Sequence, residues 1–414
     1  MNQKKKFKVV TLGCRTNQYE SQAYQDQLLT LGYKEAKGAE RVDLCIINTC
    51  TVTESADSSS RYQIRHLHRK YPDAKIVVTG CLLESAKEAL QGMDEIDCVV
   101  PNKDKENLLS YVFPEQEMPE FKICQFEAHT RAFVKVQDGC NSFCTYCIIP
   151  YVRGRSRSRD VTEILQEVKG LIANGYKEIV LTGINIGDFE SKQIRLADLV
   201  RQVDAIEGIQ RLRISSIDPD EIDEDLAGAV LHSKHTCASM HVVLQSGSNT
   251  ILKRMNRKYT REVFLETIDR LRNANPDFTF TTDVIVGFPG ESELDFQDTL
   301  AMMDYVRFAK VHMFPYSPRP RTRAVLYPNR IDSAVVNTRK QQVLRLAEEH
   351  AYFLREKYVG STLPVLIEKA EDVSSGHTEN FLHVISQDKG LKSNDLVEMQ
   401  LYENTPEGLL GRIV

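Results

Sequence analysis

The 414-residue chain has no apolar run long enough to cross a lipid bilayer, although 42% of its residues are hydrophobic. A membrane-spanning helix needs about 20 consecutive, mostly apolar residues. The first residues, MNQKKKFKVVTLGC, pass from lysines directly into a short apolar segment, so the apolar core of a signal peptide is missing there too. The sequence therefore predicts a cytoplasmic protein with no membrane association.

A large excess of charge of one sign is also missing. The 53 lysines and arginines are set against 58 acidic residues, which gives a net charge of -5. This balance argues against a protein that coats nucleic acid with its whole surface, but it leaves room for one basic face. The length suffices for roughly two to four domains. Ten cysteines are present, and in the cytoplasm they are more often thiols or metal ligands than disulfides.

Cys140, Cys144 and Cys147 lie in one segment, VQDGCNSFCTYCIIPYVRGRSRSR. At spacings of four and three residues, a single loop can turn all three thiolates toward one point. Three such ligands leave a tetrahedral zinc one ligand short, but they suit a cubane iron-sulfur cluster with one open iron. A zinc knuckle completed by a distant cysteine, or three buried cysteines, remain as alternatives.

Residues 7–113 alternate short apolar runs with polar helical stretches, which predicts a parallel sheet with helices on its faces. Three of the expected strands, in KVVTLGC, DLCIINTC and KIVVTGC, end at Cys14, Cys50 and Cys81. Ligands in open sheets of this kind bind outside the carboxyl ends of the strands. We therefore expect these cysteines to converge as a second set of three, with coincidence as the alternative.

Other cysteines have less informative surroundings. Cys45 and Cys98 lie inside apolar runs, where a cysteine usually acts as a small buried hydrophobe. Cys124 lies in a segment rich in Pro, Glu and Gln, over residues 114–130, which we interpret as a linker. No role is predicted for it.

From residue 131 to about 317, six strand-helix units predict an open or partial (β/α) barrel with its active face at the carboxyl ends of the strands. Glycines there let the backbone approach a nucleoside, and hydroxyl and amide groups can bind a ribose or an amino acid. A turn glycine or a strand-end cap is the alternative for each residue. The candidates at these ends are Gly183, Asn185, Ser215, Ser216, Gln245, Ser246, Gly287 and Gly290.

Helices are expected from the polar and apolar pattern between these strands and beyond the barrel. The C-terminal residues 358–414 form short strands separated by turn residues, which suits a small antiparallel barrel of about five strands. The strand pattern alone is compatible with a structural cap; an RNA-binding role is what the family resemblance described below implies. The principal expected helices span residues 17–31, 54–71, 160–174, 196–206, 224–232, 260–274, 294–306 and 333–357.

Taken together, TLGCRTNQYES, INTCTVTESAD, VTGC, DGCNSFCTYCIIP, LQSGS and DVIVGFPGE resemble the radical S-adenosylmethionine (SAM) methylthiotransferases along nearly the whole chain. Tyr146 before the last cysteine of the loop is part of this resemblance. It implies an α/β protein with a doubly wound methylthiotransferase domain over residues 5–118, a radical SAM domain over 128–357 and a TRAM-like RNA-binding barrel over 358–414.

The resemblance also implies the cofactors. Cys14, Cys50 and Cys81 would hold an auxiliary 4Fe-4S cluster, and Cys140, Cys144 and Cys147 would hold the cluster whose open iron binds SAM. In the family, one SAM supplies a methyl group to sulfur and a second is cleaved to a 5'-deoxyadenosyl radical. The residues expected near SAM are Gly183, Ser215, Gln245 and Asp283.

TGINIGDF and IIPYVRGRSRSR resemble the branch that acts on N6-threonylcarbamoyladenosine at position 37 of tRNA. This implies methylthiolation of carbon 2 of that base, with the tRNA anticodon loop and an electron donor such as flavodoxin or ferredoxin as partners. Four arginines beside the loop are expected to contact RNA phosphates or the threonylcarbamoyl carboxylate, or else to form a solvated basic turn. They are Arg153, Arg155, Arg157 and Arg159.

One position departs from the family pattern. Tyr-Ser-x-Arg-x-Gly-Thr is matched by YSPRPRT, so Arg321 stands where a glycine is expected. Two other functions remain open from the sequence. One is a methylthiotransferase acting on isopentenyladenosine in tRNA or on a ribosomal protein aspartate, and the other is a non-enzymatic RNA-binding protein with structural zinc sites.

Overall fold

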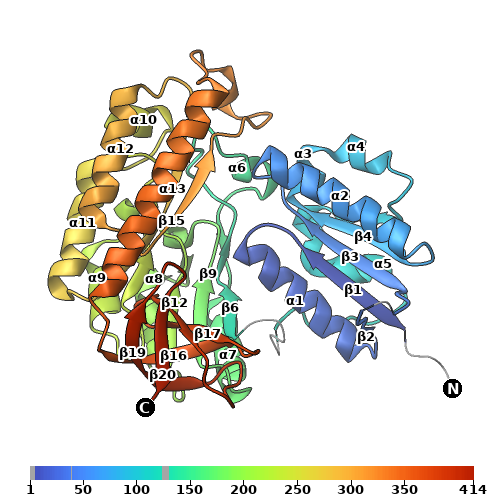
Figure 1. Ribbon diagram of the computed structural model, residues 1–414. Coiled ribbons are helices and arrows are strands. Elements are labelled where there is room, and N and C mark those ends of the chain that lie inside the picture. The colour runs from blue at the N-terminus through green and yellow to red at the C-terminus, as the bar shows by residue number, and fades with distance from the viewer. Residues whose placement is uncertain (1–4, 39, 124–129) are drawn as a thin grey trace. The chain divides into compact units, whose positions relative to one another are not determined.

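The computed structural model describes residues 5–38, 40–123 and 130–414 (Figure 1). Cys124 and the start of the expected second domain at residue 128 lie outside these ranges. The chain forms two compact units. Unit 1 is drawn from Met1–Phe126, Asp138–Arg157 and Ser317–Val325, and unit 2 from Glu127–Gln137, Ser158–Tyr316 and Leu326–Val414. The cysteine loop therefore belongs to the same unit as the N-terminal sheet.

Unit 1 is built on a five-stranded parallel sheet in the order β2-β1-β3-β4-β5. The order reverses beside β1, so helices are placed on both faces, as expected for a doubly wound sheet. This confirms the predicted fold of the N-terminal region, to which the structure adds the short β2. The strands are β1 (Lys6–Thr11), β2 (Lys34–Glu35), β3 (Leu44–Thr49), β4 (Lys75–Gly80) and β5 (Cys98–Val99).

Alternate residues of β3 face opposite cores, as the two-residue period of a strand requires. Leu44 and Ile46 pack with α1 (Arg15–Thr30) and α5 (Leu108–Val112). Cys45 and Ile47 pack in the core that contains residues of α2 (Glu54–Lys70), α3 (Cys81–Ser85) and α4 (Lys87–Gln91). Cys45 is thus a core residue, and Cys98 is partly buried against the first of these cores. A short 3-10 helix, Asn102–Asn107, precedes α5.

Unit 2 contains the six parallel strands of the predicted partial barrel. β12, β9 and β6 form one three-stranded sheet, and β13, β14 and β15 form another. Parallel bridges from Leu212 to Thr236 and from Ile217 to Val242 join the two. The strands are β6 (Arg131–Lys135), β9 (Glu178–Thr182), β12 (Arg211–Ile214), β13 (Ser239–His241), β14 (Thr279–Val286) and β15 (Lys310–Pro315).

Helices follow these strands, and except for α10 (Asn249–Arg254), which the sequence did not predict, they lie near their predicted positions because their start signals are local. Thr260, for example, accepts a hydrogen bond from the Val263 amide at the start of α11, and Ser292 and Asp295 form a capping box at α12. The helices are α7 (Val161–Ala173), α8 (Leu196–Asp204), α9 (Glu224–Leu231), α10 (Asn249–Arg254), α11 (Arg261–Ala274), α12 (Glu293–Val306) and α13 (Ser333–Glu356).

The strand predicted in HVVLQS is shorter than expected. β13 ends at His241, and single bridges then hold Val242 to Ile217 and Gln245 to Val284. Gln245 has φ of 60°, which is the left-handed region and interrupts an extended strand. The prediction placed the main strand too late because it relied on the apolar run alone.

The C-terminal residues form a closed five-stranded barrel in the order β16-β17-β18-β20-β19, which confirms the small predicted β-barrel. Its core includes Val365, Ile367, Val384 and Met399. None of the helices in the described ranges has the length and apolar character to cross a membrane. The barrel strands are β16 (Thr362–Lys369), β17 (Ser374–Thr378), β18 (His383–Ser386), β19 (Leu396–Asn404) and β20 (Leu409–Ile413).

Within unit 2, several hydrogen bonds to this barrel end on its backbone carbonyl oxygens, and the Glu368 side chain of the barrel also pairs with Arg131 at 2.8 Å. Arg211 donates to the carbonyl oxygens of Pro364 at 2.6 Å and His377 at 3.0 Å, and Arg213 donates to that of Thr378 at 3.0 Å. Glu178 of β9 lies 2.7 Å from Arg213 and compensates its buried charge. The amino end of β12 thus fixes the C-terminal barrel to unit 2.

Candidate functional site

The three strand-end cysteines occupy the loops after β1, β3 and β4. Cys14 caps the start of α1, Cys50 directly follows β3, and Cys81 begins α3. β1 and β3 are neighbours at the point where the strand order reverses, which is where open sheets bind their ligands. Burial raises the pKa of Cys50 to about 12, and the nearby thiolates of Cys81 and Cys14 act in the same direction. The structure therefore places the predicted set at the carboxyl ends of three neighbouring strands of one sheet.

A glycine precedes a cysteine at three places, and each glycine is in the left-handed region. Gly13, Gly80 and Gly139 have φ of 92°, 99° and 73°. A Cβ atom on Gly13 would lie 2.7 Å from Cys50 Sγ, and one on Gly80 would lie 2.6 Å from the Thr49 amide nitrogen. Only glycine combines this backbone conformation with such close contact. The Gly-Cys pairs thus let the cysteine loops approach neighbouring backbone.

The cysteine loop of residues 138–157 is held by its own backbone. The Cys140 amide donates to the Gly154 carbonyl at 3.2 Å, and the Cys147 amide donates to that of Cys144 at 3.0 Å. The three cysteines are partly exposed. The loop leads into α6 (Ile149–Val152), where Ile148 and Val152 form a small apolar cluster with Cys81. One turn of helix therefore connects the two cysteine sets.

In the parts of the chain that the structure describes, no three or more His, Cys, Asp or Glu side chains are grouped tightly enough for one metal ion. A cubane cluster does not require its cysteines to meet at one point, because each cysteine binds a separate iron. Thiolates in glycine-supported loops are the donors that such a cluster needs. The residues present therefore fit an iron-sulfur cluster in chemistry and in placement at loop ends.

The four arginines beside the loop have different surroundings. Arg153 is buried with Glu20 and Asp138, which differs from the expected contact with RNA. Arg157 is half exposed and pairs with Asp138 at 3.0 Å. Arg159 pairs with Glu167 at 2.7 Å. The alternating sequence suggested four equivalent side chains, but burial and pairing separate them.

Arg155, like Arg157, is exposed. Its guanidinium carbon lies 4.4 Å from the centre of the Phe143 ring, and no carboxylate in the described ranges pairs with it. An arginine stacked on an aromatic ring keeps its outer edge available for an anion. Arg155 is thus the arginine best suited to an RNA contact.

The residues expected near SAM lie in unit 2. The Gln245 amide donates to the Asp283 carbonyl at 2.8 Å, and the Ser215 amide donates to that of Leu181 at 3.0 Å. Ser215 Oγ and Gln245 Oε1 are buried and have no hydrogen-bond partner in the described structure. Gly183 packs on Gln137, whose Oε1 accepts from the amides of Ile184 and Asn185. Orphaned buried groups of this kind are compatible with a bound ligand.

Two groups near these strand ends had escaped the sequence interpretation. His241 Nε2 lies 3.4 Å from Asp283 Oδ1, and its Nδ1 contacts Thr281 Oγ1 at 2.9 Å. Glu221 accepts a hydrogen bond from Asn185 at 2.8 Å. Burial and the neighbouring Asp218 raise the pKa of Glu221 to about 7. Their positions on strands or short helices gave no sequence signal.

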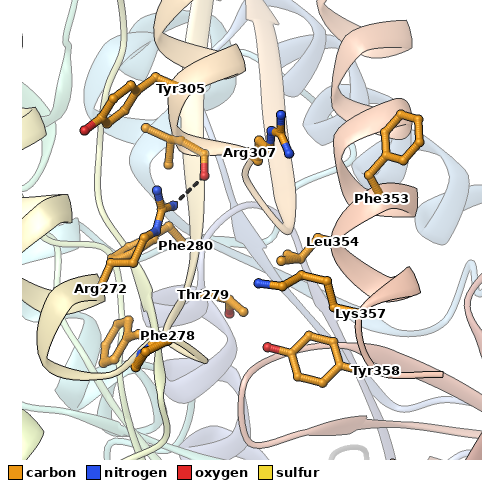
Figure 2. Close-up of a pocket in the computed structure, with 12 residues that line it drawn as sticks. Arg272, Phe278, Thr279, Phe280, Tyr305, Arg307, Phe353, Leu354, Lys357 and Tyr358 are labelled. Carbon is orange, nitrogen blue, oxygen red and sulfur yellow. Dashed lines mark hydrogen bonds between the residues drawn. The ribbon is translucent and has the colours of Figure 1, made fainter. Parts of the chain in front are cut away.

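A separate pocket of about 230 Å³ lies at the amino end of β14 (Figure 2). It is lined by aromatic residues such as Phe278 and Tyr358 and by the cations of Arg272, Arg307 and Lys357. None of the predicted site residues lines it. The carboxyl ends of the strands, rather than this pocket, therefore remain the candidate site in unit 2.

Comparison with known proteins decides the family. The radical SAM superfamily model matches residues 134–303, and the model described as uncharacterized protein family UPF0004 matches residues 6–101. A threonylcarbamoyladenosine tRNA methylthiotransferase of Chlamydia pneumoniae is 52% identical over 99% of this chain and 98% of its own length. The chain belongs to the radical SAM methylthiotransferase family.

Other members of this family support the same assignment. The threonylcarbamoyladenosine tRNA methylthiotransferase of Bacillus subtilis is 37% identical over 91% of the chain and 89% of its own length. A tRNA-2-methylthio-N(6)-dimethylallyladenosine synthase of Trichlorobacter lovleyi is 36% identical over the full length of both. The predicted family and branch are thereby confirmed.

A solved structure confirms the fold of the radical SAM region more distantly. The radical SAM methyltransferase TsrM of Kitasatospora setae has a TM-score of 0.59 at 13% identity, and the match covers 90% of this chain and 81% of that one. Membership of the radical SAM superfamily implies SAM and one 4Fe-4S cluster bound by three cysteines. The methylthiotransferase described here has a suitable loop in residues 138–157.

Proposed function

We propose that this protein methylthiolates carbon 2 of N6-threonylcarbamoyladenosine at position 37 in the anticodon loop of tRNA. The observation that carries the proposal is the 52% identity, over nearly the whole chain, to a relative named for that activity. The same relative spans both cysteine sets and the C-terminal barrel. Two separate sets suit a reaction that needs both a radical source and a sulfur carrier.

Cys140, Cys144 and Cys147 are proposed to hold the SAM cluster, and Cys14, Cys50 and Cys81 an auxiliary 4Fe-4S cluster. Three-cysteine ligation and the supporting Gly-Cys loops favour this assignment. When bound, the cofactors supply a carbon-centred radical and a methylated sulfur. Gly183, Ser215, Gln245 and Asp283 are proposed to position SAM, supported by the unpartnered oxygens of Ser215 and Gln245.

The protein itself contributes binding and orientation. The target adenosine must leave the anticodon-loop stack, as bases modified by enzymes commonly do. Arg155 on the Phe143 ring is proposed to contact the RNA. The domains at residues 5–118, 128–357 and 358–414 are proposed to bind the auxiliary cluster, SAM and RNA, respectively. A flavodoxin or ferredoxin is the proposed electron donor.

Nucleoside mass spectrometry tests the activity. In tRNA from a strain that lacks the protein, 2-methylthio-N6-threonylcarbamoyladenosine should be lost and its unmethylthiolated precursor should accumulate. Re-expression should restore it. Loss of the isopentenyladenosine product instead, or of ribosomal aspartate methylthiolation, would assign the protein to another branch.

Iron and sulfide analysis tests the cofactors separately. Protein reconstituted anaerobically should be brown and contain about eight irons per chain, the sum of two cubane clusters. Replacing Cys140, Cys144 and Cys147 together by alanine should leave about half of that iron. A colourless protein containing zinc would instead support the non-enzymatic RNA-binding alternative.

A further inference from the structure

A buried network of two cations and two carboxylates lies within unit 1. Arg153 Nη1 donates to Asp138 Oδ1 at 2.8 Å and to Glu20 Oε1 at 3.2 Å. Lys105 Nζ lies 2.7 Å from Asp138 Oδ2 and also pairs with Glu20. The side chains of Arg153 and Glu20 are 0% exposed. Such groups remain charged in the interior only because they compensate one another.

The network reaches both cysteine segments through Asn17 and Asp138. Arg153 Nη2 donates to Asn17 Oδ1. Asn17 in turn donates to the backbone carbonyls of Leu12 at 2.6 Å and Thr49 at 3.1 Å, beside Cys14 and Cys50. Asp138 Oδ1 accepts from the Gly139 amide at 2.8 Å, next to Cys140. The same buried charges thus support loops from both sets.

One donor in the network is left over. Both Nη atoms of Arg153 are used, but its buried Nε has no hydrogen-bond partner among the described residues. The preceding residue, Val152, packs against Cys81. Burial alone would lower the pKa of Arg153. The negative charges of Asp138, Cys81 and Cys14, among others, outweigh burial and raise this pKa. A buried N-H of a charged group without an acceptor is costly, so an acceptor is expected near Cys81.

We propose that Arg153 is a positioning residue whose Nε-H donates a hydrogen bond to a sulfur atom of the cluster held by Cys14, Cys50 and Cys81. The inference rests on the second cluster of the proposed function. A donor to a cluster sulfur stabilises the more negative, reduced form, and hydrogen bonds to sulfur are among the factors that set cluster potentials. Arg153 therefore raises the potential of the auxiliary cluster while connecting it to the SAM-cluster loop.

The test isolates the auxiliary cluster in full-length protein that carries Cys140→Ala, Cys144→Ala and Cys147→Ala and has been reconstituted with iron and sulfide. Its midpoint potential is measured by a redox titration followed by electron paramagnetic resonance. Arg153→Lys keeps the positive charge but removes the Nε-H. We expect the oxidised-to-reduced ratio at a fixed potential to rise about tenfold, equivalent to a fall of about 59 mV for one electron.

Glu20→Gln is the matched control, because it disturbs the same network but keeps the Arg153 Nε-H. Removing this negative charge should leave the potential unchanged or raise it. A role for Arg153 in folding alone would shift both variants in the same direction or neither. An unchanged potential in Arg153→Lys, or an equal fall in Glu20→Gln, overturns the proposal.

A second variant keeps the proposal testable if Arg153→Lys fails to bind the cluster. The combination Arg153→Met with Glu20→Gln removes one cation and one anion, so the network stays balanced. Because its net charge equals that of the parent protein with the three alanines, its potential should lie below the parent's, and equality of the two overturns the inference. If the parent with the three alanines binds no iron, the second cluster itself is refuted and the inference falls with it. If the parent binds its iron but the Arg153 variants have the same potential as the parent, only the role of Arg153 is refuted, and the second cluster stands.

Discussion

Arg321 occupies a backbone conformation that favours glycine. Its φ is 70°, and its guanidinium carbon lies 5.0 Å from the centre of the Tyr151 ring. The comparison with the family pattern had identified this position from the sequence, and the structure shows that the backbone keeps the left-handed path. The cation-π contact, worth about 0.5–1 kcal/mol at an exposed site, offsets part of the strain.

The variants Arg321→Gly and Arg321→Ala should therefore differ in stability. Arg321→Ala loses the contact with Tyr151 but keeps the left-handed strain, which is about 1–2 kcal/mol for an L-residue. Arg321→Gly relieves that strain and adds about 0.5–1 kcal/mol of backbone entropy cost. We expect the glycine variant to be more stable than the alanine variant by about 1 kcal/mol in urea denaturation. Equal stability would show that the backbone has relaxed.

Glu221 should make stability depend on pH. Its folded-state pKa is raised from 4.5 to about 7, chiefly by burial and then by Asp218. A raised pKa contributes stability that is complete below pH 4.5 and is lost as the pH rises through about 7, because the buried carboxylate must then ionise. The loss is about 3 kcal/mol.

Glu221→Gln removes this titration and preserves the size of the side chain. Denaturation midpoints measured from pH 5 to 8 should decline more steeply for the natural protein than for the variant. Parallel pH profiles would contradict a raised pKa at this position. The carboxylates of Asp218, Asp220 and Asp188 face Glu221 and are common to both proteins, so they cancel in the comparison.

At the scale of single elements, local sequence signals were sufficient for the long helices, but not for the short α6 and α10. α1, α2 and α13 begin and end within about two residues of their predicted bounds, which is the usual uncertainty of helix ends. The strand-end positions of one cysteine set and the spacing of the other likewise indicated both sets from the sequence. Sequence could not reveal that Arg153 pairs with Glu20, because 133 residues separate them and only the folded chain brings them together.

The turn after β4 should tolerate no side chain at Gly80. With φ of 99° and backbone atoms of Thr49 within 2.6 Å of an added Cβ, Gly80→Ala should cost about 2–5 kcal/mol. It should also displace Cys81 and lower the iron content of reconstituted protein. Urea denaturation and iron analysis measure the two effects.

Gly154→Ala is the matched control for Gly80. Gly154 also has a left-handed φ, 81°, but no atom lies within 4 Å of its added Cβ. Its cost should be limited to about 1–2 kcal/mol of backbone strain, with normal iron content. Similar losses in both variants would mean that conformation, rather than contact with Thr49, explains the glycine at position 80.

At the scale of the whole molecule, the proposed tRNA complex should depend on salt through Arg155. Arg155→Gln should weaken binding of modified and unmodified tRNA alike and reduce the slope of log affinity against log salt by roughly 0.7–1 if it contacts a phosphate. A contact with the threonylcarbamoyl carboxylate should weaken only the modified tRNA. Filter binding across salt concentrations separates the two.

Arg159 provides the control for that measurement. Its side chain is 20% exposed, and its guanidinium already pairs with Glu167, so Arg159→Gln should leave the salt slope unchanged. If Arg155→Gln also behaves like the natural protein, Arg155 belongs to a solvated turn. The alternating sequence alone could not show which arginine is available to RNA, because the partners that engage the others are distant along the chain and are known only from the fold.

The attachment of the C-terminal barrel has a consequence for how the protein can diverge. Arg211 and Arg213 bind carbonyl oxygens of that barrel, and every amino acid offers the same carbonyl group. Substitutions among the outward-facing side chains of the barrel therefore leave these bonds intact. Selection can therefore alter much of the barrel's outer surface, where tRNA is proposed to bind, without disturbing these bonds, with the exception of side chains such as Glu368, which pairs with Arg131 at 2.8 Å.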